Sequence, residues 1–216
     1  MGVTIWVSRE VTNGDPVHET FEVARQAFVV GLAKRFGLKP ERKEDCLPEF
    51  VDYGLRGSQA GQAASLIRVL AGYGLGRFVI DVPQDDPRAA EILQRAGEEA
   101  ARRLCAAVSP HSGKGVAVRL TCAAAGNGDA LHAAFEAARR AFVAGLARRF
   151  GLRSEDGLSF KAARAGEAAR FLKELARRGL GGFAVSVPES DPRAAGIMQE
   201  ASREAGEELS VEVCCI

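Results

Sequence analysis

Residues 13–38 and residues 127–152 are two copies of one 26-residue segment. The copies NGDPVHETFEVARQAFVVGLAKRFGL and NGDALHAAFEAARRAFVAGLARRFGL are identical at 18 of 26 positions and need no gap. A second matched pair begins at Phe78 and Phe183, 105 residues apart, whereas the first pair is separated by 114 residues. The first copy therefore carries nine additional residues, which fall between Leu38 and Asp52. A chain with this repeat is expected to fold as two similar units.

The composition excludes several classes of protein. With 216 residues, 47% apolar and 26% charged, the chain matches a soluble globular protein. Its net charge of +1 and its mixed Arg and Glu give no basic patch, so we expect no nucleic-acid partner. Five cysteines without metal-ligand spacing predict reduced thiols, a cytoplasmic location and no zinc site. We expect no secretion and no membrane insertion, because neither a signal peptide nor an apolar run of about 18 residues is present.

Each copy opens with a predicted strand and a long amphipathic helix. Apolar and polar residues alternate over 3–8 and 116–121, which is the period of a half-buried strand. Asp15 and Asp129 can cap the helices that follow, and Gly37 and Gly151 end them. The helices carry the same apolar stripe in both copies: Phe21, Ala24, Phe28, Leu32 and Phe36 in the first, and Phe135, Ala138, Phe142, Leu146 and Phe150 in the second.

The rest of each copy predicts a polar connector, a short edge strand, a shorter helix, a strand, a helix and a closing strand. The expected edge strands are 52–56 and 158–161, the shorter helices 60–71 and 165–178, the next strands 78–82 and 183–187, and the closing strands 104–108 and 209–213. Asp86-Pro87 and Asp191-Pro192 open the last helices. The polar segment 110–115 predicts a turn that joins the copies as a hairpin.

This order of elements predicts an α+β fold of two tandem ferredoxin-like (split βαβ) units. The first repeat spans 1–110, a connecting turn spans 111–115, and the second repeat spans 116–216; together they form one compact pseudosymmetric domain. Right-handed crossovers put the helices on one face of an antiparallel or mixed sheet and leave the other face free. Strand order across the halves and closure into a pseudo-two-fold barrel are left open.

The regularity of the local signals resembles that of computationally designed ferredoxin-like α/β repeat proteins. The Asp-Pro helix starts, the Gly stops and the runs RAAEILQRAGEEAARRL and EAARFLKELARRGL carry this resemblance along the whole chain. It implies idealised caps, patterns and turns and no evolved activity. The nine-residue insertion with Cys46, two mid-helix glycines and the adjacent Cys214-Cys215 depart from such a scaffold. A tandem duplication in an Ala/Arg/Gly-rich proteome is the alternative origin.

The free face of the sheet is the predicted site. Ala, Ser and Cys dominate it, although these residues have low strand propensity on a solvated face, so we expect a pocket for a small, partly apolar molecule. A packed interface and a plain solvated face are the alternatives. Trp6 would stack on a ring, and Arg119 would bind a carboxylate or phosphate or pair with neighbouring acids. The predicted ligand-binding residues are Trp6, Ser8, Asp81, Arg119, Thr121, Ser186, Ser210 and Glu212.

Two further repeated features are candidates for function. His18 and His132 lie three residues beyond the capping aspartates. If both rings face a shared cavity, they could exchange protons near neutral pH and have a function. If both lie on the surface, they are only a repeated residue without a role. Gly31 and Gly145 lie in mid-helix at a cost of about 1 kcal/mol relative to Ala, which close helix packing or space beside a ligand would offset.

No other motif carries chemistry. The glycines at 72–76 precede a strand and are interpreted as a helix C-cap, and the Gly-Lys-Gly at 113–115 lacks the rest of a phosphate loop. Cys122 and Cys215 are expected to be buried on the helix side of their strands, and Cys105 and Cys214 to lie on the free face; a reactive thiol would need a nearby cation such as Arg119. Cys46 has no assigned role.

The sequence therefore predicts a non-catalytic binding protein with no cofactor and no metal, either monomer or homodimer. A structural or self-associating scaffold without a ligand is the alternative. An enzyme would require His18 or His132 within about 3 Å of a nucleophile or a bound water.

Overall fold

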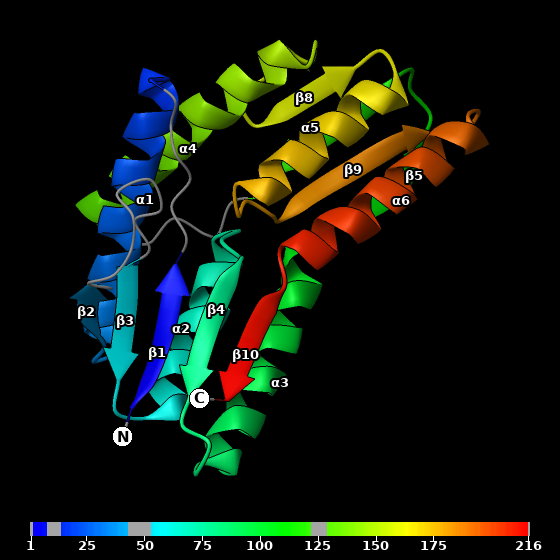
Figure 1. The fold of residues 1–216 in the computed structure, drawn as a ribbon. Coiled ribbons are helices and arrows are strands. Elements are labelled where there is room, and N and C mark those ends of the chain that lie inside the picture. The colour runs from blue at the N-terminus through cyan, green and yellow to red at the C-terminus, as the bar shows by residue number, and fades with distance from the viewer. Residues whose placement is uncertain (1, 8–13, 43–52, 122–128, 216) are drawn as a thin grey trace.

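The computed structural model describes residues 2–7, 14–42, 53–121 and 129–215, which form an α+β fold of six helices and two mixed five-stranded sheets (Figure 1). The helices are α1 (Pro16–Arg35), α2 (Ala60–Gly72), α3 (Pro87–Leu104), α4 (Ala130–Arg149), α5 (Ala165–Arg177) and α6 (Pro192–Glu208). The first sheet has the order β10 (Val211–Cys215), β4 (Phe78–Val82), β1 (Val3–Val7), β3 (Tyr53–Gly57) and β2 (Lys39–Arg42). The second sheet has the order β5 (Ala107–His111), β9 (Phe183–Pro188), β6 (Val116–Leu120), β8 (Ser159–Ala162) and β7 (Arg153–Ser154).

Each sheet is completed by a strand from the other copy. β10, at the end of the second copy, pairs parallel with β4, and β5, at the end of the first copy, pairs parallel with β9. The other pairs of both sheets are antiparallel. The copies predicted at 1–110 and 116–216 thus exchange their last strands, which ties the two halves together.

The predicted hairpin between the copies is wrong. β9 lies between β5 and β6 in the second sheet, with Ser186 paired to Ser109 on one side and to Ala117 on the other. The four residues 112–115 are long enough to cross the end of one strand, where the backbone N–H of Glu189 donates to the carbonyl of His111. The described strands also form two separate sheets rather than a closed barrel.

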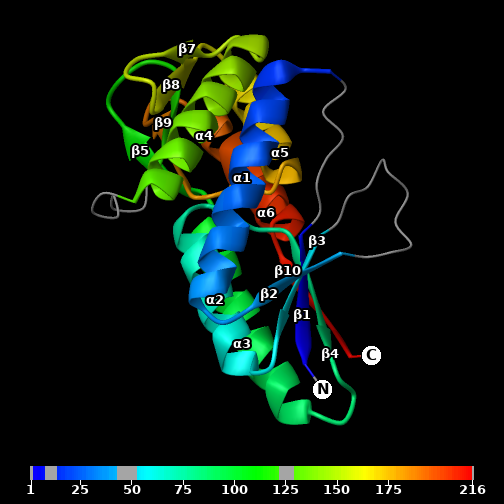
Figure 2. The same cartoon turned by 90° about the vertical axis from the view of Figure 1, so that its left-hand side faces the viewer.

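Helices cover one face of each sheet, as the alternating pattern predicts. Val3, Ile5 and Val7 of β1 are buried, whereas Thr4 and Trp6 between them are only half-buried. Figure 2 shows the first sheet nearly edge-on, with α2 and α3 on one side of it. The opposite face of each sheet carries no helix of the described chain.

The two halves meet where the segments that follow α2 and α5 run antiparallel. Leu75 and Leu180, both fully buried, form a single bridge there. Two hydrogen bonds flank it reciprocally, from Gly76 N to Gly179 O at 3.0 Å and from Gly181 N to Gly74 O at 2.8 Å. Gly74 has a φ of 73°, and a Cβ on it would collide with the carbonyl of Gly181. These paired contacts define a pseudo-two-fold axis between the copies.

Candidate functional site

α1 and α4 pack along each other in antiparallel directions across the pseudo-two-fold axis (Figures 1 and 2). Phe21 stacks on Phe142 with ring centroids 4.7 Å apart, and Phe28 stacks on Phe135 at 4.4 Å. The apolar stripes predicted from the sequence therefore face each other. Because the helices are antiparallel, the N-terminus of each lies beside the C-terminus of the other.

Six charged or titratable side chains are buried in this interface, and the sequence analysis singled out only two of them. They are His18, Glu22 and Arg25 on α1 and His132, Glu136 and Arg139 on α4. Of the two alternatives for the histidines, surface exposure is wrong: His18 and His132 are both buried, because the first turn of each helix packs against the opposite half. The missed signal is a charged residue inside the apolar stripe: Arg25 is four residues after Phe21 and three before Phe28, and the copy repeats this spacing.

The buried charges are paired within each helix. Nη2 of Arg139 donates to Glu136 at 2.8 Å, and Nη1 of Arg25 donates to Glu22 at 3.3 Å. Burial alone would raise the pKa of Glu22, but hydrogen bonding to His18 and the charge of Arg25 outweigh it, so the pKa of Glu22 is lowered. The carboxylate is therefore ionised in the folded protein at neutral pH.

Two of the buried side chains, Arg139 and His18, also contact the opposite half. Nη1 of Arg139 donates to the carbonyl of Tyr73 at 2.6 Å. Nη1 of Arg178 lies 2.8 Å from Nδ1 of His18, whose ring stacks on Phe142 at 5.3 Å. Because these buried side chains bind one another and the opposite half, we interpret the network as the element that fixes the pairing of α1 with α4.

Ion pairs close the two ends of the α1–α4 interface. Nη2 of Arg149 lies 2.5 Å from Asp15, and in the equivalent place Nη2 of Arg35 lies 2.6 Å from Asp129. Each aspartate also caps its own helix, since Asp15 accepts from the backbone N–H of Val17 and Asp129 from that of Leu131. Hydrogen bonding to Arg149 is the main cause that lowers the pKa of Asp15.

The two ends differ in the side chain that lies against the mid-helix glycine. At one end, Leu131 lies against Gly31 so closely that a Cβ on this glycine would meet the Leu131 Cδ2 methyl. At the other end, the shorter Val17 reaches only to 4.0 Å from the position of a Cβ on Gly145. Val17 also leaves 43% of its surface exposed. A hollow of about 400 Å³ remains beside Gly145 at this end.

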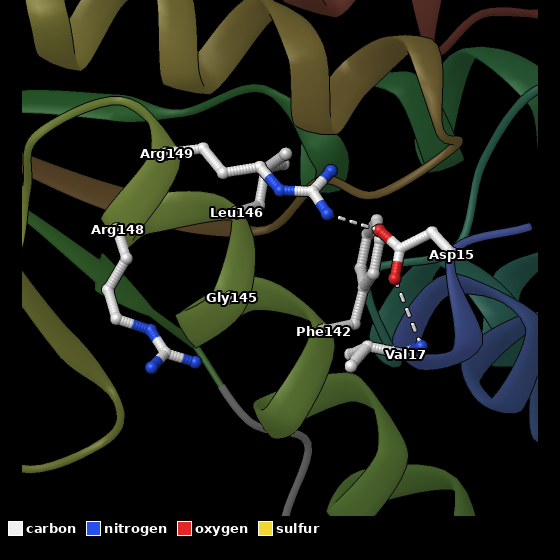
Figure 3. Close-up of a pocket in the computed structure, with 7 residues that line it drawn as sticks. All are labelled: Asp15, Val17, Phe142, Gly145, Leu146, Arg148 and Arg149. Atoms are coloured by element: carbon white, nitrogen blue, oxygen red, sulfur yellow. Dashed lines mark hydrogen bonds and ion pairs between the residues drawn. The ribbon is translucent and has the colours of Figure 1, made fainter. Parts of the chain in front are cut away.

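We call this hollow the α1–α4 groove. Its lining comes from the start of α1 and the end of α4 (Figure 3). The lining residues are Asp15, Val17, Phe142, Gly145, Leu146, Arg148 and Arg149. Phe142 and Leu146 are buried and give it an apolar wall. Arg149 reaches across to Asp15 (Figure 3). Arg148, on the adjacent side of α4, is exposed and forms no ion pair with the described residues.

The structure divides the predicted sheet-face residues between two sheets. Trp6, Asp81 and Glu212 lie on the first sheet, and Arg119 and Ser186 on the second. Thr121 directly follows β6 and Ser210 directly precedes β10, while Ser8 lies outside the described residues. Trp6 and Arg119 occupy equivalent positions in the two copies, as do Asp81 and Ser186, so the predicted set is two equivalent groups rather than one cluster.

Within these groups, several polar atoms already have partners. Nε1 of Trp6 donates to Asp81 at 2.6 Å, and the indole lies over Gly54 of the neighbouring strand. The hydroxyl of Thr121 donates to the carbonyl of Gly182. Arg119 is one of the charges that lower the pKa of Asp156, after the backbone hydrogen bonds from Leu158 and Ser159.

The described cysteines are Cys105, Cys214 and Cys215, none of which forms a disulfide with another. Cys105 caps the end of α3 rather than lying in a strand, because α3 extends to Leu104 and β5 begins only at Ala107. Cys215 is exposed, although burial was expected, because it lies at the end of an edge strand. Partial desolvation and the nearby Glu212 raise the pKa of Cys214, which opposes thiolate formation. Cys46 and Cys122 lie outside the described residues.

The described residues contain neither a cluster of metal ligands nor a helix suited to a membrane. No group of three or more His, Cys, Asp or Glu side chains lies where it could hold a metal ion. In the same part of the chain, no helix combines the length and the apolar character needed to cross a membrane.

Comparison of the chain with protein-family models, with curated proteins and with solved structures found no match in any of the three. A function must therefore be inferred from the α+β fold and from the chemistry of the α1–α4 groove.

Proposed function

We propose that the protein is a non-catalytic binding protein whose α1–α4 groove takes a small, partly apolar molecule. One observation carries this proposal: the position that Leu131 fills against Gly31 is left open by Val17 against Gly145. The two helices are identical at 12 of 20 positions, including the buried His, Glu and Arg, so the open end is a local difference rather than loose packing of the whole interface.

The size and lining of the groove support a small ligand. A volume of about 400 Å³ lies within the range of small-molecule sites, which combine apolar walls with a few polar groups. Gly145 keeps the floor of the groove open, at a cost of about 1 kcal/mol relative to Ala in mid-helix. A guest that covers the exposed Val17 would remove apolar surface from water and offset that cost.

The charged groups of the groove favour binding over catalysis. Arg149 holds the pKa of Asp15 below its ordinary value, so this carboxylate is a weak proton acceptor near neutral pH. The neighbouring His18 is buried and contacts Arg178 and Glu22. An exchange of protons with a guest is therefore not part of the proposed function.

Thermal unfolding with the neutral probe 4-isobutylbenzamide tests the proposal. A ligand that binds the native state raises the melting temperature with its concentration. We expect this rise for the wild type and its loss in Val17→Leu, which copies the leucine of the other half and should retain the fold. An equal rise in both proteins would contradict binding in the groove.

We also infer that each half is a ferredoxin-like unit extended by one helix and an exchanged strand. The order β4-β1-β3-β2, with α1 joining β1 to β2 and α2 joining β3 to β4, supports this inference. In the second half, β9-β6-β8-β7 has the same order.

A second candidate site is the helix-free face of the two sheets. It is favoured by Trp6, which stays half-buried over Gly54 and presents an aromatic surface beside Asp81. A screen of small molecules by thermal shift against Trp6→Ala and Arg119→Ala tests this site. A hit whose effect is lost in either variant, but kept in Val17→Leu, would place binding on the sheet face.

A self-associating scaffold without a ligand is the alternative function. The outer edges of β10 and β5 pair with no other described strand, and such edges can pair with a second copy. Light scattering distinguishes the cases, since a stable dimer that survives dilution would favour the scaffold.

A further inference from the structure

We propose that the guest of the α1–α4 groove is a monocarboxylate with a branched aliphatic end. This inference rests on the proposed function and adds the chemical class of the ligand. It combines two independent observations: the shape of the side chain that fills the equivalent position, and the charge at the rim of the groove.

The shape comes from the second copy. There the isobutyl group of Leu131 lies against Gly31, between the same two helices and beside the same kind of Asp–Arg ion pair. Val17 has one carbon fewer and leaves the corresponding space over Gly145 open. The protein thus contains its own example of a group that fits this packing, a branched four-carbon chain.

The charge comes from the last turns of α4. Arg149 is neutralised by Asp15 at 2.5 Å, whereas Arg148 makes no ion pair with the described residues. The end of α4 does not require Arg148 for capping, because the backbone N–H groups of Phe150, Gly151 and Leu152 already donate to carbonyls of its last turn. The fork of a guanidinium matches the two oxygens of a carboxylate.

Asp15 restricts the charge of the guest. It is ionised and lies on the wall of the groove, so it would repel a dianion more strongly than a monoanion. The lining therefore fits one negative charge near Arg148 and an apolar body along Val17, Phe142 and Leu146.

Calorimetric titration of the full chain with 4-isobutylbenzoate, 4-isobutylbenzamide and benzoate tests the inference. We expect 4-isobutylbenzoate to bind about twofold to fivefold more tightly than the amide at low salt. Benzoate, which lacks the branched end, should bind about tenfold more weakly than 4-isobutylbenzoate.

Arg148→Gln should remove the preference for the acid over the amide. Arg140→Gln is the matched control, because Arg140 is exposed on the same helix, forms no ion pair with the described residues and does not line the groove. Equal binding of acid and amide to the wild type would overturn the carboxylate inference, as would an equal loss of preference in both variants. If neither probe binds, the proposed function itself fails.

Discussion

Arg139 donates a 2.6 Å hydrogen bond to the carbonyl of Tyr73, 66 residues away in the other copy, while its other Nη holds Glu136. This side chain is fully buried, and it links the α1–α4 interface to the segment that leads into the first sheet. Removing a partner of a buried ion pair leaves a charge without compensation, which is more damaging than the loss of an exposed pair.

Arg139→Met should therefore lower the free energy of unfolding by about 3 to 5 kcal/mol, because Glu136 would remain buried without its arginine. Urea denaturation measures the change. Arg140→Met, an exposed position on the same helix, should stay within about 0.5 kcal/mol of the wild type. Similar losses in both variants would show that the buried network is not a main determinant of stability.

The two mid-helix glycines should respond differently to alanine. Gly145→Ala is expected to stabilise the protein by about 1 kcal/mol, because its new methyl group would have only ordinary contact with Val17 at 4.0 Å. Gly31→Ala should gain clearly less, since the methyl would displace Leu131. Thermal unfolding of the two variants provides the comparison, and an equal gain at both positions would refute the asymmetry on which the groove depends.

Glu22 should make the free energy of unfolding depend on pH in the acidic range. Its folded pKa lies below the ordinary value of 4.5, so its contribution is present above that value and is lost as the pH falls through the lowered pKa. The stability difference between wild type and Glu22→Gln should therefore shrink below about pH 4.5. Urea denaturation across this range measures it. A difference that stays constant from about pH 6 to about pH 3 would contradict the ionised, paired state of Glu22.

Cys214 should react slowly with thiol reagents. Desolvation and the charges of Glu212 and Asp81 raise its pKa, so little thiolate is present near neutral pH. Mass spectrometry after brief treatment with iodoacetamide should show less modification at Cys214 than in the variant Glu212→Gln. Equal modification would mean that Glu212 does not control this thiol.

Much of the local structure could be predicted because its signals are local. Asp15 with Pro16 starts α1, and the alternation of Val3, Ile5 and Val7 with polar residues identifies β1 and its buried face. The edge strand β2, which contains Pro40, could not be recognised in a polar connector. The exchange of β5 and β10 also escaped prediction, because it depends on contacts between distant segments.

The candidate site was harder to predict from the sequence than the local structure. The sequence identified Gly31 and Gly145 and offered both explanations, close packing and space beside a ligand. The structure places Leu131 against the first glycine and a groove beside the second. To choose between them, one needs the antiparallel crossing of α1 and α4, which brings Val17 to Gly145. Periodicity gives the buried face of each helix and does not give its partner.

The most direct test of the proposed function is a ¹H–¹⁵N NMR titration of the wild type with 4-isobutylbenzoate. We expect saturable shifts that centre on the amides of Val17, Gly145 and Arg148, and their absence in Val17→Leu at the same concentrations. Shifts that centre on β1, β4 or β6, or shifts that persist unchanged in Val17→Leu, would contradict binding in the α1–α4 groove.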